Sequence, residues 1–247
     1  MKAEPAHQIR LLDLQDIDTV IDRLRHRARN LPENVELEEL DAEIARLNDA
    51  AAQTAAELKD LDREQRKAES DVDQVRTREE RDGKRLEAGQ VSSPKELESL
   101  QSEIASLRRR RAELEDIVLG VMERREGVEA KQAADAEALT VGQEKRVEAE
   151  RRQKAALEEI SVEERDAGER RAKLRGDLPQ DLLTLYDKLR DSYGGVGAAA
   201  LRQGRCEGCK LALSTAEVSQ IRSAPAEEVV RCEECRRILV RTPESGL

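Results

Sequence analysis

Residues 37–86 read LEELDAEIARLNDAAAQTAAELKDLDREQRKAESDVDQVRTREERDGKRL, and their spacing carries most of the information about the fold. Alternating steps of three and four residues from Leu37 meet fifteen positions without a slip, and eleven of these positions are apolar. The positions are Leu37, Leu40, Ile44, Leu47, Ala51, Thr54, Leu58, Leu61, Gln65, Ala68, Val72, Val75, Glu79, Asp82 and Leu86. A mean step of 3.5 residues is typical of a helix that pairs with another helix in a left-handed coiled coil.

A second series with the same spacing follows farther along the chain. It runs through Leu97, Leu100, Ile104, Leu107, Arg111, Leu114, Val118, Val121, Arg125 and Val128, becomes more polar, and resumes at Ala156, Ile160, Ala167 and Leu174. The two series predict two long helices of similar length that pair along their apolar seams.

The stretch EAGQVSSPKELESL, residues 87–100, connects the two series and contains both a helix end and a helix start. Gly89 suits the end of the first helix, and Ser93 can cap the second, with Pro94 at its first position. Glu96 is placed to close a capping box. Because a short connection makes helices antiparallel neighbours, residues 1–177 are expected to form a hairpin with its tip near residues 87–95.

The seam is also present before Leu37, but its phase changes. Its positions are Leu14, Ile17, Ile21, Leu24, Ala28 and Leu31, and extending them forward misses Leu37 by two residues. Pro32 lies within this slip, and proline removes a helical hydrogen bond and restricts the residue before it. We therefore expect the first arm of the hairpin to be kinked near Pro32.

Composition supports a helical hairpin over a single large globular core. Charged residues make up 40% of the 247 residues, and Tyr186 and Tyr193 are the only aromatic side chains. The formal net charge of -10 argues against a general polyanion binder. The chain has no apolar run long enough to span a membrane, and its first residues are too acidic for a secretory signal, so we expect a cytoplasmic protein.

The heptad pattern fades before Leu178, and a different segment begins there. In residues 178–200 we expect a short amphipathic connecting helix, with Leu182, Leu183, Leu185, Tyr186 and Leu189 on one side, followed by a linker. Residues 201–247 contain all four cysteines of the chain.

The cysteines form two CxxC pairs, Cys206 with Cys209 and Cys232 with Cys235, and twenty-two residues separate the pairs. This spacing is typical of a four-thiolate zinc ribbon, because each tight CxxC turn directs two sulfurs to one ion. The sequence thus predicts one structural zinc ion. A redox dithiol or a disulfide is the alternative, and catalytic zinc is disfavoured because four sulfurs leave no site for water.

Basic residues beside the cysteines are the candidates for nucleic-acid binding: Arg205, Lys210, Arg236 and Arg237. They could equally offset the negative charge of a zinc–thiolate cluster. No aromatic residue follows Leu201, so contact with RNA or DNA would go through phosphates. No carboxylate, histidine or serine constellation indicates an enzyme.

The segments SSPKELESLQSEI, PQDLLTLYDKL, GRCEGCKLAL and VVRCEECRRILVR together resemble a bacterial family of coiled-coil hairpins that end in a C4-type zinc ribbon. The resemblance spans nearly the whole chain. It implies zinc at the four cysteines, a kinked hairpin with its tip remote from the metal, and a nucleic-acid-binding or transcription-linked adaptor. Members of this family tend to carry an aromatic residue where this chain has Val240, which removes a possible stacking platform.

Two functional hypotheses follow. In the first, the ribbon binds RNA or DNA while the hairpin positions it. In the second, the coiled coil is a scaffold for protein partners and zinc only folds the terminal domain. The partner-binding candidates in the second hypothesis are the tip residues Ser93, Pro94, Lys95 and Glu96.

Overall fold

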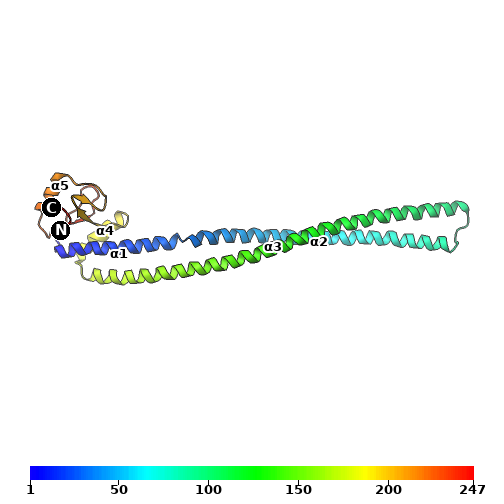
Figure 1. Cartoon of the computed structure of the whole chain (residues 1–247), viewed down its shortest axis with the longest axis horizontal. Helices are drawn as coiled ribbons and strands as arrows, with labels where there is room; N and C mark the ends of the chain where they lie inside the picture. Colours follow the sequence, from blue (N-terminus) through cyan, green and yellow to red (C-terminus); the bar gives the residue numbers. More distant parts are fainter. The chain divides into compact units, whose positions relative to one another are not determined.

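The computed structural model describes residues 1–247, and five helices and three short strands follow one another along the chain (Figure 1). They are α1 (Pro5–Arg29), α2 (Pro32–Glu87), α3 (Pro94–Gly176), α4 (Gln180–Ser192), β1 (Ala198–Arg202), β2 (Arg205–Cys206), α5 (Thr215–Ser223) and β3 (Ile238–Val240). The chain divides into two compact units, one of residues 35–150 and one that combines residues 1–34 with 151–247.

None of the helices has the length and apolar character that crossing a membrane requires.

The unit of residues 35–150 is an antiparallel pair formed by α2 and the first part of α3. All fifteen seam positions predicted between Leu37 and Leu86 are buried or half-buried. Ion pairs across the helices join Arg146 to Asp41 (2.5 Å), Arg124 to Glu64 (2.6 Å) and Arg108 to Glu79 (2.9 Å). Because residue numbers rise on one helix as they fall on the other, the pair is antiparallel, which confirms the predicted coiled-coil hairpin.

The polar seam positions of α3 form ion pairs with α2. Arg111 donates from Nη1 to Glu79 Oε2 (2.7 Å), and Arg125 lies 3.5 Å from Asp62. Gly142 brings the helices close at another seam position, since a Cβ there would lie 3.5 Å from Ile44 Cγ1. Long cationic side chains and a glycine thus continue the seam where apolar residues become sparse.

The turn between α2 and α3 is built by caps at both helix ends. Gly89 has φ +65°, and the amides of Gly89 and Gln90 donate to the carbonyls of Leu86 and Arg85, which is a Schellman ending. At the start of α3, Ser93 Oγ accepts from the Glu96 amide (3.2 Å). The Glu96 carboxylate accepts from the Ser92 amide and hydroxyl (3.1 and 2.8 Å), and not from Ser93 as the capping-box prediction implied.

The interruption expected near Pro32 is present. The helix α1 ends at Arg29, and α2 begins at Pro32 after a two-residue gap (Figure 1). Leu31, in the gap, packs with Leu24 and Ile160 in a buried cluster. The chain therefore keeps an apolar contact where proline prevents a continuous helix.

The buried face of α1 is wider than the predicted seam. Asp18 is buried, whereas Ile17 is only partly covered. The seam prediction assumed one partner helix, but α1 is also covered by α4 and by the strands of the ribbon, which widens its buried face. The residues buried on α1 are Gln8, Leu11, Leu14, Gln15, Asp18, Ile21 and Leu24.

The ribbon contains a three-stranded sheet in the order β2-β1-β3, with β1 antiparallel to β2 and parallel to β3. One face of this sheet joins the core made by α1 and α4, where Tyr186 and Leu182 are fully buried together with Ile238 and Val240. The amino terminus also pairs with the ribbon, because the Ala3 amide donates to the Glu227 carbonyl (2.7 Å). The ribbon is thus packed on the helical base of its own unit.

Candidate metal centre

The four cysteine sulfurs converge in the ribbon. Cys206 Sγ lies 3.8 Å from Cys235 Sγ, Cys209 Sγ lies 3.9 Å from Cys232 Sγ, and all four atoms lie within 4.8 Å of one another. A tetrahedral zinc site with Zn–S bonds of about 2.3 Å has sulfur–sulfur edges of about 3.8 Å. Since a disulfide needs a separation of about 2.05 Å, the spacing fits one four-coordinate metal ion and not a disulfide.

The two CxxC turns repeat the same backbone geometry. They lie in the six-residue segments RCEGCK, 205–210, and RCEECR, 231–236. The amides of Lys210 and Arg236 donate to the carbonyls of Cys206 and Cys232 (2.8 and 2.9 Å), and both Lys210 and Arg236 have φ +62°. Each turn therefore closes on a left-handed residue, which bends the backbone so that both sulfurs of the pair face one point.

The surroundings shift the pKa values of these thiols in both directions. Burial raises the pKa of Cys206 to about 12, against the opposing effect of the amides of Cys209 and Gly208. The pKa of Cys235 is lowered to about 7, because hydrogen bonds from the amide and guanidinium of Arg237 outweigh its burial. The backbone amides and the Arg237 guanidinium thus favour the thiolate form of the cysteines, which is the form that binds zinc.

Gly208 allows the first turn to approach its neighbours. A Cβ on this residue would lie 2.9 Å from Arg237 Cδ and 3.0 Å from Ala199 Cβ. A larger residue would push the first turn away from β1 and from the second turn.

The all-sulfur donor set and the tetrahedral spacing fit one structural zinc ion, held by Cys206, Cys209, Cys232 and Cys235.

Arg237 has a structural position beside the metal centre. Its guanidinium donates to the carbonyls of Val196 and Tyr193 (both 2.9 Å) and lies 5.5 Å from the centre of the Tyr193 ring. Arg237 also lowers the pKa of the Cys235 thiol. These contacts tie the second turn to the linker that follows α4.

The other three basic candidates lie on the surface of the ribbon. Arg205 donates to the Lys210 carbonyl (2.9 Å), and Lys210 forms an ion pair with Glu207. The side chain of Arg236 is exposed and has no ion pair. The ribbon thus brings Arg205, Lys210 and Arg236 to its exterior, and nucleic-acid binding by them stays a prediction.

The tip candidates lie in the other compact unit, that of residues 35–150. Ser93 and Glu96 are engaged in the cap of α3, and Lys95 is exposed without an ion pair. An open hollow of about 410 Å³ adjoins them, lined by Leu86, Gly89, Val91, Ser92, Ser93, Pro94 and Leu97. The tip therefore presents apolar surface beside a free cation.

Sequence reasoning did not anticipate a buried polar cluster between α1 and α4. Asp18, which is 1% exposed, accepts a hydrogen bond from the Tyr186 hydroxyl (2.7 Å), forms an ion pair with Arg171, and lies 3.4 Å from Arg190 Nε. Gln15 Oε1 accepts from the Gly197 amide (2.7 Å) at the start of the ribbon. One signal was present, because an acid lies four residues after Leu14 and three residues before Ile21, both of which are seam positions.

Comparisons with known proteins agree with this architecture. The CT398-like coiled coil hairpin domain matches residues 14–194, and the C4-type zinc ribbon domain matches residues 205–239. The chain belongs to the CT398-like coiled-coil hairpin family. The resemblance seen in the sequence and the expectation of one structural zinc ion are thus confirmed.

Relatives in this family align over almost the whole chain. The uncharacterized protein Rv2229c of Mycobacterium tuberculosis is 38% identical over 241 residues, which cover 98% of each chain. The uncharacterized protein ML1638 of Mycobacterium leprae is 29% identical over 221 residues, covering 90% of this chain and 94% of the relative.

Solved structures show the same fold. A protein from Mycobacterium smegmatis has a TM-score of 0.84 and 36% identity, covering 98% of this chain and all of its own. CT398 from Chlamydia trachomatis has a TM-score of 0.72 and 19% identity, covering 96% of this chain and 98% of its own. The CT398 likeness concerns the fold alone.

Proposed function

We propose that this member of the CT398-like family is a non-enzymatic adaptor of the cytoplasm, in which a structural zinc ion stabilises the ribbon and the helical hairpin presents surfaces to protein partners. The closed donor set carries this proposal. Four protein sulfurs satisfy a tetrahedral ion and leave no position for a substrate or a reactive water.

The tip supports the protein-partner part of the proposal. Val91 and Leu97 border the hollow, and Leu97 remains 39% exposed. Apolar surface at a helical turn, next to the free cation of Lys95, suits a partner with an apolar side chain and an acidic neighbour. These features support the proposal that the tip residues Ser93, Pro94, Lys95 and Glu96 contact a protein partner.

Site-specific photocrosslinking in cells tests the proposal. A benzophenone amino acid replaces Lys95 at the tip, and in a matched control it replaces Lys131, an exposed lysine of α3. We expect discrete covalent adducts from position 95, and their loss when Val91→Ser is added. Adducts of equal yield from both positions, or none from position 95, would contradict a partner site at the tip.

A second candidate function is nucleic-acid binding by the ribbon, in a transcription-linked adaptor. The exposed, unpaired guanidinium of Arg236 favours it, with Arg205 and Lys210 on the same domain. Against it stands Arg237, whose donors are occupied within the protein. The test is a titration of zinc-loaded protein with RNA and DNA oligonucleotides at about 50 mM salt, with Arg236→Glu as the variant. Absence of salt-dependent binding would remove this candidate.

A further inference from the structure

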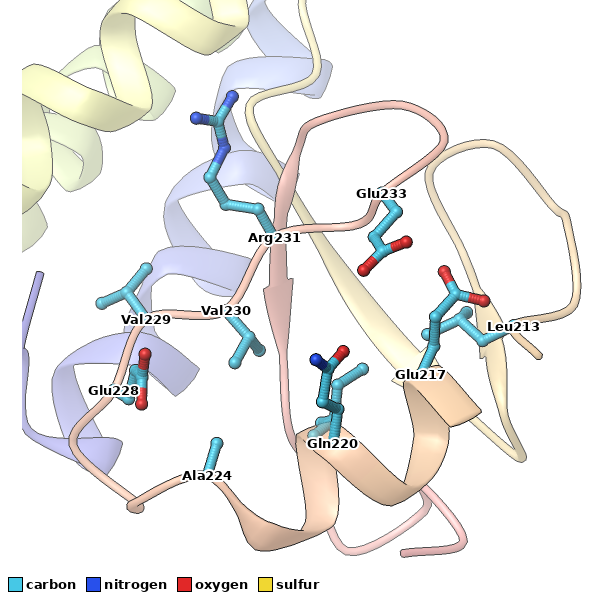
Figure 2. Close-up of a pocket in the computed structure, with 10 residues that line it drawn as sticks. Leu213, Glu217, Gln220, Ala224, Glu228, Val229, Val230, Arg231 and Glu233 are labelled. Carbon is cyan, nitrogen blue, oxygen red and sulfur yellow. The ribbon is translucent and has the colours of Figure 1, made fainter. Parts of the chain in front are cut away.

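A groove runs along one side of the ribbon between α5 and the segment of residues 228–233 (Figure 2). Its volume is about 460 Å³, which falls within the range of about 300–1,000 Å³ that is common for ligand sites. Aliphatic side chains form much of its lining: Leu213, Ile221, Ala224, Val229 and Val230. Ile221 is buried, and the others are partly exposed, so the groove offers apolar surface to an incoming side chain.

Carboxylates surround this apolar lining. Figure 2 shows Glu217 and Glu233 directed to the same side of the groove, with Glu228 at the other end. Glu217 is fixed by the Ser214 amide (2.6 Å), whereas Glu228 and Glu233 form no ion pair. The groove therefore carries uncompensated negative charge.

The one basic residue of the lining does not neutralise these acids. Arg231 Nε donates to the carbonyl of Arg236 (2.7 Å), and Figure 2 shows its guanidinium extending away from α5. The groove is thus acidic, and it repels nucleic acid and acidic peptides alike.

The walls of the groove are held in place from within the domain. Arg241 donates to carbonyls at the end of α5 and in the following loop: Ile221 (3.4 Å), Ala224 (3.0 Å), Pro225 (2.8 Å), Ala226 (2.9 Å) and Glu228 (2.8 Å). One guanidinium therefore connects both sides of the groove. A preformed site loses less conformational entropy on binding.

We propose that this groove binds a short basic peptide segment of a partner protein, with one or two aliphatic side chains on the apolar lining and flanking Lys or Arg side chains beside Glu228 and Glu233. The inference extends the proposed adaptor function to a second surface, in the unit that does not contain the tip. Crosslinking at position 95 and peptide binding at the groove are separate measurements, so each proposal can fail alone.

Fluorescence anisotropy of the zinc-loaded full chain with labelled hexapeptides tests the groove. The probe is KRILRK, and its controls are EEILEE, which reverses the charges, and KRSSRK, which lacks the aliphatic pair. We expect saturable binding of KRILRK and at least about tenfold weaker binding of both controls, because KRSSRK has no aliphatic side chains to bury on the lining and the groove carboxylates repel EEILEE. Equal binding of EEILEE, or no binding of KRILRK at millimolar concentration, would overturn the proposal.

Two double variants of equal charge separate the groove from the net charge of the protein. Glu228→Gln with Glu233→Gln removes groove carboxylates, and Glu227→Gln with Glu234→Gln removes exposed carboxylates outside the lining. We expect the first pair to weaken KRILRK binding about fivefold and the second to leave it within about twofold. Equal loss in both pairs would mean nonspecific attraction and would refute the site. Zinc content, measured for each variant, verifies that the ribbon is folded.

Discussion

Asp18→Asn is expected to loosen the attachment of α4 to α1, because it removes a buried charge from the centre of a polar cluster. The carboxylate of Asp18 accepts from Tyr186 and forms ion pairs with Arg171 and Arg190. Asparagine has nearly the same size, but it leaves two partly buried guanidinium groups without their common counterion. Removing one partner of a buried ion pair costs about 3–5 kcal/mol, and we expect a loss of stability of about 3 kcal/mol.

The two tyrosines make this loss measurable at the site itself. Tyr186 and Tyr193 are the only aromatic residues, and both belong to α4 or its end. Near-ultraviolet circular dichroism during urea unfolding therefore reports on this unit, while the far-ultraviolet signal reports on all helices. With m-values of about 1–3 kcal/mol/M, the tyrosine transition of the variant moves to lower urea by about 1 M or more.

Asp22→Asn is the matched control for this experiment. Asp22 also pairs with Arg190 (2.6 Å), but its side chain is 41% exposed, so the expected loss is at most about 1 kcal/mol. If Asp18→Asn shifts the tyrosine transition no more than Asp22→Asn does, the cluster contributes little and the reasoning from burial is refuted.

Three other perturbations have defined outcomes. Gly197→Ala should lower the melting temperature, since its Cβ would lie 2.6 Å from the Tyr186 carbonyl oxygen. Gly120→Ala should raise the melting temperature slightly, because its Cβ would meet no neighbouring atom and alanine favours a helix. Equal melting shifts in the two variants would contradict this reasoning. Chelation at neutral pH should release one zinc ion per chain and unfold the ribbon while the far-ultraviolet helical signal largely persists, and a folded, protease-resistant ribbon without metal would oppose a structural role. Burial, and then the hydrogen bond to Asp18, raise the pKa of Tyr186 above its usual value of about 10. The folded state therefore retains this proton to a higher pH than the unfolded chain does, and the free energy of unfolding should fall as pH rises above about 10. An absorbance titration of the folded protein in which both tyrosines ionise near pH 10 would contradict this expectation.

Much of the helical architecture could be predicted because coiled-coil packing depends on local spacing. A 3.5-residue repeat identifies the buried positions of α2, and every predicted position between Leu37 and Leu86 is at least half-buried. Capping preferences placed the end of α2 near Gly89 and the start of α3 at Pro94. In α1 the same repeat predicts that Ile17 is buried, whereas the structure buries Asp18. The repeat describes contact with one partner helix, and α1 has several neighbours.

The metal centre was also predictable, since the chemistry of four thiolates and the CxxC turn leave few alternatives. The neighbouring basic residues were not, because charge alone does not distinguish a surface side chain from one inside the domain. Arg237 was grouped with Arg236, yet its guanidinium binds the Val196 and Tyr193 carbonyls while Arg236 is exposed. This distinction depends on a linker some forty residues earlier in the chain.

Periodicity and ligand spacing, both local properties of the chain, were enough to specify a kinked helical hairpin that ends in a four-cysteine zinc ribbon. The docking of α4 and the ribbon on α1 was settled only in three dimensions, as were the burial of Asp18 beneath Tyr186 and the groove beside α5. Their physical basis is contact between segments far apart in the chain. Asp18 and Tyr186 meet because apolar side chains of several elements share one core, and no repeat within a single helix encodes that meeting.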